Sequence, residues 1–229
     1  MQNFYENHVK HYIATDCIIF GFDQKELKIL LIKRGFEPEK GNWSLMGGFV
    51  GTEESLDEAA SRILYKLTGL RDVYMEQLYA YGDVNRDPVA RTISVAYYAL
   101  IRTDSYEKAL AERYNAKWFA ISEKPDLIFD HEVMVRKALA RLRRKTRTQP
   151  IGFELLPEKF TMPQLRHLYE AINDTKYDRR NFSKKIRSMR WIVKLDEKDK
   201  SSSKKGAYYY NFDSEMYQEM QADGFSFQL

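Results

Sequence analysis

Three acidic residues, Glu53, Glu54 and Asp57, gather where a glycine-containing stretch, 47–51, gives way to an apolar-periodic one. Carboxylates this close together can hold a divalent cation, because Mg²⁺ prefers oxygen ligands and can clamp a phosphate. Acids in the first turn of a helix also interact favourably with the helix dipole, and that interaction needs no metal. We favour the dipole interpretation, and a metal site at these acids is the alternative.

A helix is predicted directly after these acids. Ser55 and Glu58 have the spacing of a capping box, in which each side chain accepts a hydrogen bond from the other residue's backbone. Gly69 is placed to end the helix, as a glycine does at a helix C-terminus. The apolar face at helical spacing consists of Leu56, Ala59, Ala60, Ile63, Leu64 and Leu67.

This stretch resembles the Nudix box, a glycine loop followed by a helix that bears metal-binding glutamates. The residues that fall on the pattern are Gly48, Glu54, Arg62, Leu64, Gly69 and Leu70. The three positions that hold metal in that family carry Ile63, Lys66 and Leu67 here. The resemblance therefore implies a hydrolase-like pocket that no longer hydrolyses, so we expect no enzyme activity, no metal and no cofactor. It also implies that Arg62 pairs with an acid on the loop.

The bulk properties indicate a globular protein of one large or two small domains. The chain has 229 residues, 44% of them hydrophobic, which is enough for a sizeable core. No apolar run is long enough to span a membrane, and the N-terminus has no signal-peptide pattern. Cys17 is the single cysteine and lies in an apolar run, which predicts a buried thiol. These features favour the cytoplasm.

The charge is distributed unevenly. The net charge of the chain is only +4. Residues 176–205, however, hold twelve Lys or Arg against four acids, whereas the residues after Asn211 are acidic. A basic segment of this kind is typical of a nucleic-acid-binding surface, and an ordinary solvated face is the alternative.

The first part of the chain alternates strands and helices. Strands are predicted over 15–22, 27–34, 77–81, 92–102 and 116–120, and helices over 55–68 and 130–147. A polar loop with a proline occupies 83–91. The fold class is therefore α+β, with a mixed sheet between helices.

Pro150 and Gly152 interrupt the helical pattern after a very basic helix end, which predicts a domain boundary near 148–152. We expect a first domain over 1–149 and a second over 150–229. In the second, helices are predicted over 162–172 and 179–189, the latter capped by Asp178, followed by strands over 191–195 and 207–212. Two helices and a hairpin with a basic tip are typical of a winged helix-turn-helix.

The second of these helices presents side chains that can read DNA. Arginine and asparagine can pair with guanine and adenine edges in the major groove, and lysines in the hairpin can contact phosphates. The predicted DNA-binding residues are Arg179, Arg180, Asn181, Lys184, Lys185, Arg187 and Arg190 in the helix and Lys204 and Lys205 in the hairpin.

Nearly the whole chain is similar to the NrtR-type family of Nudix-related transcriptional regulators. The segments that carry this resemblance are Arg86-Asp87-Pro88, Ser94-Val95-Ala96-Tyr97, Phe129-Asp130-His131, Phe160-Thr161 and Asp178-Arg179-Arg180-Asn181-Phe182. The resemblance implies a homodimer on palindromic double-stranded operator DNA, which a small ligand releases. Family members answer to ADP-ribose or to a pentose such as L-arabinose. We favour the pentose, since a pocket without metal carboxylates suits an uncharged sugar, and ADP-ribose is the alternative.

A sugar needs polar groups for its hydroxyls and an apolar wall for its carbon atoms. The candidate effector-binding residues are Asp16, Arg34, Asn42, Trp43, Glu54, Tyr81, Asp83 and Arg86. Trp43 has a core position as its alternative, because aromatic side chains are usually buried. The four histidines, at 8, 11, 131 and 167, lack metal-ligand spacing, so we expect surface or packing roles for them.

Two other functions fit the same sequence. One is a diverged Nudix hydrolase that takes metal ligands from elsewhere in the chain. The other is a scaffold whose basic hairpin binds an acidic partner.

Overall fold

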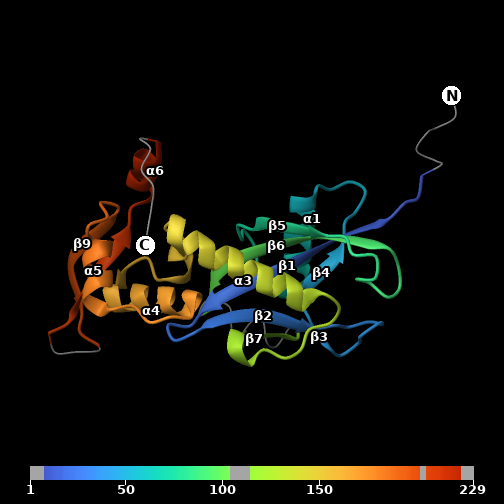
Figure 1. Ribbon diagram of the computed structural model, residues 1–229, viewed down its shortest axis with the longest axis horizontal. Helices are drawn as coiled ribbons and strands as arrows, with labels where there is room; N and C mark the ends of the chain where they lie inside the picture. Colours follow the sequence, from blue (N-terminus) through green and yellow to red (C-terminus); the bar gives the residue numbers. More distant parts are fainter. Residues whose placement is uncertain (1–7, 104–113, 202–204, 223–229) are drawn as a thin grey trace.

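The computed structural model describes residues 8–103, 114–201 and 205–222. Its strands are β1 (Tyr12–Phe22), β2 (Leu27–Lys33), β3 (Trp43–Ser44), β4 (Met46–Phe49), β5 (Glu76–Tyr81), β6 (Thr92–Arg102), β7 (Ala116–Ala120), β8 (Phe160–Thr161), β9 (Ile192–Asp199) and β10 (Ala207–Phe212). Its helices are α1 (Leu56–Thr68), α3 (His131–Thr148), α4 (Met162–Asn173), α5 (Arg179–Arg187) and α6 (Ser214–Ala222), with short 3-10 turns η2 (Ile121–Glu123) and η3 (Phe153–Leu155). Figure 1 shows the larger sheet and α1 toward one end of the molecule, α4, α5 and α6 toward the other, and α3 across the middle.

The larger sheet is mixed, as the sequence predicts. Its main order is β3-β2-β1-β6-β5, with β4 also paired to β1 and β7 to β2. β1 and β6 run parallel in continuous register from Tyr12↔Thr92 to Phe22↔Arg102, and the other pairings are antiparallel. The central strands are thus held by hydrogen bonds on both sides.

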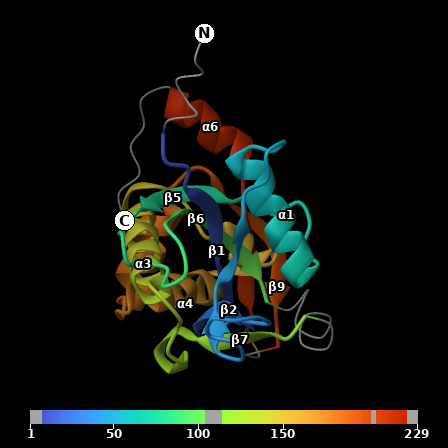
Figure 2. The ribbon, with the colours of Figure 1, turned by 90° about the vertical axis from the view of Figure 1, so that its right-hand side faces the viewer.

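Helices cover both faces of this sheet. Alternate residues of a strand point to opposite faces, so Ile18 and Phe20 pack with α3 while Cys17 and Ile19 pack with α1. Figure 2 shows α1 and α3 on opposite sides of β1. Burial of both faces explains why β1 reads as an almost continuous apolar run. It also confirms that the Cys17 thiol is buried.

Helix α1 begins and ends where its sequence signals predict. The Ser55 hydroxyl accepts a hydrogen bond from the Glu58 backbone, and the Glu58 carboxylate accepts one from Ser55 N at 2.8 Å. Gly69 follows the helix in the left-handed conformation, with φ of 76°, which a residue without a side chain adopts at little cost. The two caps fix where the helix begins and ends, and Ala60 and Leu64 pack it on the sheet.

The C-terminal residues form a winged helix. Thr161 caps α4 through a capping box with Gln164, and Asp178 caps α5 by accepting a hydrogen bond from Asn181 N at 2.8 Å. Strands β8, β10 and β9 form a three-stranded sheet beside these helices. The apolar sides of α4 and α5 are buried, including Leu165, Leu168, Phe182 and Ile186.

Some predicted boundaries in this part are wrong. Helix α5 ends at Arg187 and not Met189, because the Met189 amide bonds the Ile186 carbonyl in a tighter turn. Strand β9 begins at Ile192 and runs to Asp199, since its pairing with β10 extends to Ala207↔Asp199.

Helix α6 was not predicted, because the segment after Asn211 is short and acidic. Asp213 starts it by accepting a hydrogen bond from Met216 N at 2.9 Å. Its Tyr217 ring then packs edge-on against Trp191, with 5.3 Å between ring centroids. An aspartate cap followed by apolar residues at positions 216, 217 and 220 is the signal that marks this helix.

Helix α3 joins the two ends of the molecule, and Figure 1 shows it running from the sheet toward α4. Its Arg143 Nε donates to the Ile172 carbonyl of α4 at 2.8 Å, and Thr146 Oγ1 lies 3.2 Å from Asn173 Oδ1. One apolar cluster continues from the sheet through Leu142 of α3 into α4. Among the described residues, no helix is long and apolar enough to cross a bilayer.

Candidate functional site

A cavity of about 310 Å³ opens between β4, the end of α1 at Leu67 and the start of α3. Three of the eight predicted effector residues line it: Asp16 of β1, Arg34 after β2, and Arg86 of the loop before β6. The other lining residues that matter for its chemistry are Phe36, Ser44, Gly47, Gly48, Leu67, Asp87, Phe129 and His131. Polar groups thus meet aromatic rings in one hollow, as a small-molecule site requires.

Asp16 forms the polar floor of this cavity. It is only 5% exposed, and its carboxylate accepts a hydrogen bond from Ser94 Oγ at 2.6 Å. Arg86 Nη2 and His131 Nε2 each lie 3.5 Å from its oxygens. A Cβ on Gly47 would stand 2.2 Å from Asp16 Oδ1, so the carboxylate occupies the space that only glycine leaves open. The buried charge is therefore surrounded by partners, as burial of a carboxylate demands.

Arg86 fastens the loop before β6 to the start of α3. Its Nε and Nη2 donate to the two carboxylate oxygens of Asp130 at 2.9 and 2.8 Å. Burial is the largest single influence on the pKa of Arg86 and disfavours the charged form. The hydrogen bonds to Asp130 and the negative charges of Asp16, Asp130 and Asp87 together outweigh burial and raise that pKa. Asp130 occupies the N-cap position of α3, and its carboxylate is used for this pair and not for capping. The pair is two-pronged and largely buried, which is the geometry in which arginine binds a carboxylate most strongly.

His131 belongs to the same network. The Leu45 amide donates to its Nδ1 at 3.2 Å, so Nδ1 is an acceptor and the ring proton lies on Nε2, toward Asp16. Burial lowers the pKa of His131, which keeps the ring neutral. The expectation of a surface or packing role is thus corrected to a buried position in the cavity wall. The Phe129-Asp130-His131 segment of the family resemblance was the signal that pointed to it.

Arg34 lies at the mouth of the cavity between two aromatic rings. Its guanidinium carbon stands 4.0 Å from the Phe36 ring centroid and 5.2 Å from that of Phe129. Phe36 and Phe129 were not among the predicted site residues, because each lies in a loop whose path the local pattern does not determine.

Glu54, a predicted effector residue, has a structural role next to the cavity. Its carboxylate accepts hydrogen bonds from Gly51 N at 2.6 Å and from Arg62 Nε at 2.7 Å. The bond from Arg62, followed by that from Gly51, lowers the pKa of Glu54 to about 2. This confirms the expected pairing of Arg62 with a loop acid, and it places Glu54 outside the cavity lining.

The four remaining predicted effector residues also lie outside the lining. Trp43 packs edge-on against Phe119, with 4.7 Å between centroids, in agreement with its core alternative. Tyr81 is buried under Tyr79 and α3, and burial raises its pKa to about 12. Asn42 binds Glu39 and Asp83 binds the Asn85 amide, each within its own turn. Proximity to the Nudix-like stretch in sequence did not place these side chains in the cavity.

The three positions that bind metal in the Nudix box carry side chains that are not metal ligands here. Ile63 is buried and packs on Gly48, Leu67 lines the cavity, and Lys66 points into solvent. Within the described ranges, no group of three or more His, Cys, Asp or Glu side chains is arranged to hold a metal ion. The alternative metal site at Glu53, Glu54 and Asp57 therefore has no support, since Glu54 is bound to Arg62 and Asp57 accepts a hydrogen bond from Tyr97.

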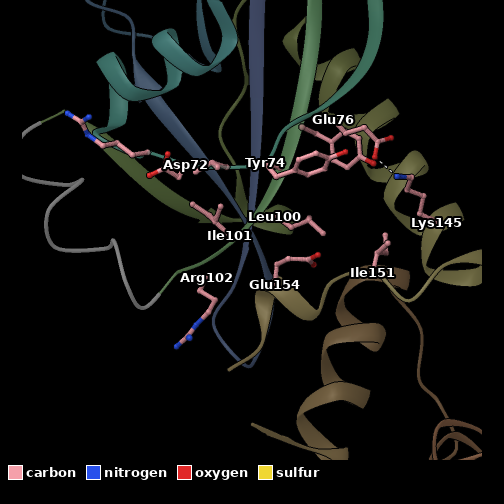
Figure 3. Close-up of a pocket in the computed structure, with 13 residues that line it drawn as sticks. Asp72, Tyr74, Glu76, Leu100, Ile101, Arg102, Lys145, Ile151 and Glu154 are labelled. Carbon is pink, nitrogen blue, oxygen red and sulfur yellow. Dashed lines mark hydrogen bonds and ion pairs between the residues drawn. The ribbon is translucent and has the colours of Figure 1, made fainter. Parts of the chain in front are cut away.

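A second hollow lies at the far end of the sheet, where β6 extends past β5. Its volume is about 520 Å³, and it is lined from β6, from α3 through Lys145, and from η3 through Glu154. Figure 3 shows Glu76 and Lys145 joined by an ion pair at its edge, with Leu100 and Ile151 facing the space. No predicted site residue lies in this hollow.

The predicted DNA-binding residues of α5 lie on its exposed face, and Arg190 lies just after the helix ends. Arg179, Arg180, Asn181, Lys184, Lys185, Arg187 and Arg190 are all exposed. Helix α5 contains no acid, and in the part of the chain that the structure describes none of these side chains forms an ion pair. A hollow of about 220 Å³ between α4, α5 and β10 is lined by three arginines, Arg166, Arg179 and Arg187. This face is free to meet an anionic surface.

The hairpin contributes lysines beside this face. Lys205 is exposed at its tip, and the Nζ atoms of Lys194 and Lys198 lie 3.6 and 4.3 Å from the Tyr208 ring centroid. Lys204, predicted to contact phosphate, lies outside the described residues. Helix and hairpin together form one basic surface.

Comparison with known proteins agrees with both parts of the structure. The NUDIX domain family matches residues 10–141, and the NrtR DNA-binding winged helix domain matches residues 152–212. A Nudix domain followed by a winged helix defines a Nudix-related transcriptional regulator. The chain belongs to the NrtR-type family of these regulators.

Three relatives are especially informative. The ADPR responsive transcriptional repressor NtrR of Acinetobacter baylyi is 33% identical over 204 residues, which cover 87% of this chain and 81% of the relative. Shewanella oneidensis NrtR, solved in complex with a 27mer DNA, has a TM-score of 0.78 and 27% identity over 87% of this chain and 93% of its own. The NUDIX domain of the same NrtR, solved with ADP ribose, has a TM-score of 0.55 and 28% identity over 62% of this chain and 94% of its own.

Proposed function

We propose that this protein is a transcriptional repressor that ADP-ribose releases from its operator. The observation that carries the proposal is a cavity with a polar floor and aromatic walls that lacks the metal carboxylates of a Nudix hydrolase. Such a cavity can bind a ligand without turning it over. The basic face of α5 supplies the DNA contacts on the same chain.

The ligand proposed here is ADP-ribose and not the pentose favoured from the sequence. The A. baylyi relative is named as ADPR responsive, and the S. oneidensis NUDIX domain was solved with ADP ribose. None of the three relatives is named for a pentose. A volume of about 310 Å³ also lies in the range of pockets that enclose drug-sized ligands, and Phe36 and Phe129 offer ring faces for a planar base.

The proposed working unit is a homodimer on a palindromic operator. In this unit, residues 1–149, which end with α3, bind the effector, and residues 150–229 bind the DNA. Two recognition helices related by a twofold axis would meet two half-sites one or two helical turns apart. Light scattering of the purified protein, alone and on operator DNA, measures the number of copies.

The proposal is tested on DNA selected by the protein from a random pool. We expect ADP-ribose to release the selected duplex in a mobility-shift assay, while L-arabinose, xylose and NAD leave the complex intact. Release by arabinose without release by ADP-ribose would overturn the effector assignment. A protein that selects no sequence at all would overturn the regulator assignment.

A further inference from the structure

Arg34 and Arg86 both line the effector cavity, and within the described ranges Arg34 makes fewer ion pairs with carboxylates. Its Nε donates to the Phe36 carbonyl at 3.1 Å. Its Nη groups make no ion pair with any carboxylate among the residues that the structure describes. A guanidinium has five N–H donors, so the two Nη groups retain four for a ligand.

The other two cations that line the cavity are already engaged. Arg86 is bound in two-pronged fashion to Asp130 and lies 3.5 Å from Asp16, so it neutralises buried carboxylates. Lys33, which also lines the cavity, is exposed, and its Nζ lies 5.3 Å from the Trp43 ring centroid. An anion entering the cavity therefore meets Arg34 as its available partner.

The backbone holds Arg34 in place for this role. Arg34 N donates to the Asn42 carbonyl at 2.9 Å, and Gly41 N donates to the Arg34 carbonyl at 2.8 Å. The rings of Phe36 and Phe129 then restrict the guanidinium. A side chain fixed in advance loses little conformational entropy when a ligand binds.

We infer that Arg34 binds the diphosphate of ADP-ribose and supplies the positive charge that a metal ion supplies in a Nudix hydrolase. The inference rests on the proposed function, because it takes ADP-ribose as the ligand of this cavity. Paired N–H donors of a guanidinium match two phosphate oxygens, which a lysine cannot do with the same geometry.

Repulsion between the ligand's diphosphate and the carboxylates of the cavity does not prevent this binding. The charge of Asp16 is met by Ser94, Arg86 and His131. The Asp87 carboxylate accepts hydrogen bonds from Val89 N at 2.9 Å and from Thr92 Oγ1 at 3.5 Å. In this inference, Arg34 at the end of β2 provides the positive charge that a metal ion on the helix provides in a Nudix hydrolase.

The test measures binding of ADP-ribose and of adenosine, which has no phosphate, by calorimetry in buffer containing EDTA. For the Arg34→Gln variant of the full chain we expect ADP-ribose to bind about tenfold to 100-fold more weakly. Adenosine should bind the variant and the unchanged protein alike. Arg34→Lys should recover part of the loss, and the control Lys117→Gln, at an exposed lysine outside the cavity lining, should change ADP-ribose affinity by less than about threefold.

Each outcome separates the two proposals. If the unchanged protein binds no ADP-ribose with or without Mg²⁺, the proposed function fails. If it binds ADP-ribose and Arg34→Gln binds equally well, the role of Arg34 fails while the proposed function stands. An equal loss of adenosine binding would assign Arg34 to the base and overturn the inference, as would binding that requires Mg²⁺. An unaltered melting temperature without ligand shows that the variant is folded.

Discussion

His131 shows how a single residue of the cavity sets the electrostatics of the whole site. Its Nδ1 already accepts the Leu45 amide, so a second ring proton can be added only by breaking that bond. The ring stays neutral although Asp16 lies 3.5 Å from Nε2, because burial is the larger influence on its pKa. The folded protein therefore resists a protonation that the unfolded chain accepts freely.

The lowered pKa of His131 makes stability fall on the acid side of neutrality. The unfolded histidine takes up a proton near pH 6.5 and the folded one does not, so the unfolded state binds more protons below that pH. We expect the free energy of unfolding to drop as the pH falls from 7 to 5. Urea titrations across that range measure it.

His131→Asn keeps an acceptor near Nδ1 but does not titrate, so its stability should change less over the same pH range. His167→Asn is the control, because His167 is exposed on α4. The explanation is wrong if His167→Asn flattens the profile and His131→Asn does not.

The buried pair of Arg86 and Asp130 should be the costliest ion pair to break among those described above. Their side chains are 5% and 19% exposed. We expect Asp130→Asn to lower the free energy of unfolding by about 3 kcal/mol, because the buried guanidinium loses its two-pronged partner and keeps only Asp16, at 3.5 Å, as a counter-charge. Chemical denaturation gives the value.

The surface pair Lys159–Glu197 is the matched control. Its side chains are 49% and 59% exposed, so Glu197→Gln should cost less than about 1 kcal/mol. Similar losses in the two variants would show that the Arg86–Asp130 pair contributes no more than a surface pair.

At the scale of elements, α1 has the length and caps of a Nudix-box helix but lacks the metal-binding glutamates. The capping box and the left-handed Gly69 are in place, while Ile63 is buried and Lys66 is exposed. Helix geometry and metal binding depend on different residues, so one can persist without the other.

We therefore expect no turnover of ADP-ribose, NADH or nucleoside diphosphate sugars in the presence of Mg²⁺ or Mn²⁺. Product analysis by chromatography, with an active Nudix hydrolase as positive control, measures the rate. Metal-dependent release of AMP at about 1 per second would contradict the expectation.

Helix α5 and the hairpin should contribute differently to DNA binding. Arg180 lies near the start of α5, where a side chain can reach base edges. Arg180→Ala should cost roughly 1–3 kcal/mol on the selected operator and relax its sequence preference. Lys205→Ala should weaken binding to operator and scrambled duplexes alike. It should also lower the slope of the logarithm of the binding constant against the logarithm of salt concentration by about 1, as loss of one phosphate contact does.

Fluorescence anisotropy over a salt series distinguishes these two effects. Lys117→Ala, at an exposed lysine on β7 of the larger sheet, is the control for lost surface charge. Unchanged binding in both the Arg180 and Lys205 variants would mean that DNA meets another surface.

At the scale of the whole molecule, the sequence predicted most elements but little of the cavity. The bounds of β6, β7 and β10 and the caps at Ser55 and Asp178 agree with the structure, because periodicity and capping act between near neighbours in the chain. The cavity instead gathers residues from separate strands, loops and helices. Phe36 and Phe129 come from loops, and the fold of the loop before β6 buries Arg86, which no local pattern reveals.

The parallel pairing of β1 with β6 also governs when the protein can form. Tyr12 and Thr92 are partners, so the two central strands lie about eighty residues apart in sequence. At typical rates of translation, β1 waits on the order of ten seconds before its neighbour has been synthesised. Distant pairing of this kind slows folding, because the intervening loop must close before any contact forms. During that interval β1 can pair with β2 and β4, but the edge of β1 that β6 later covers stays open to other strands.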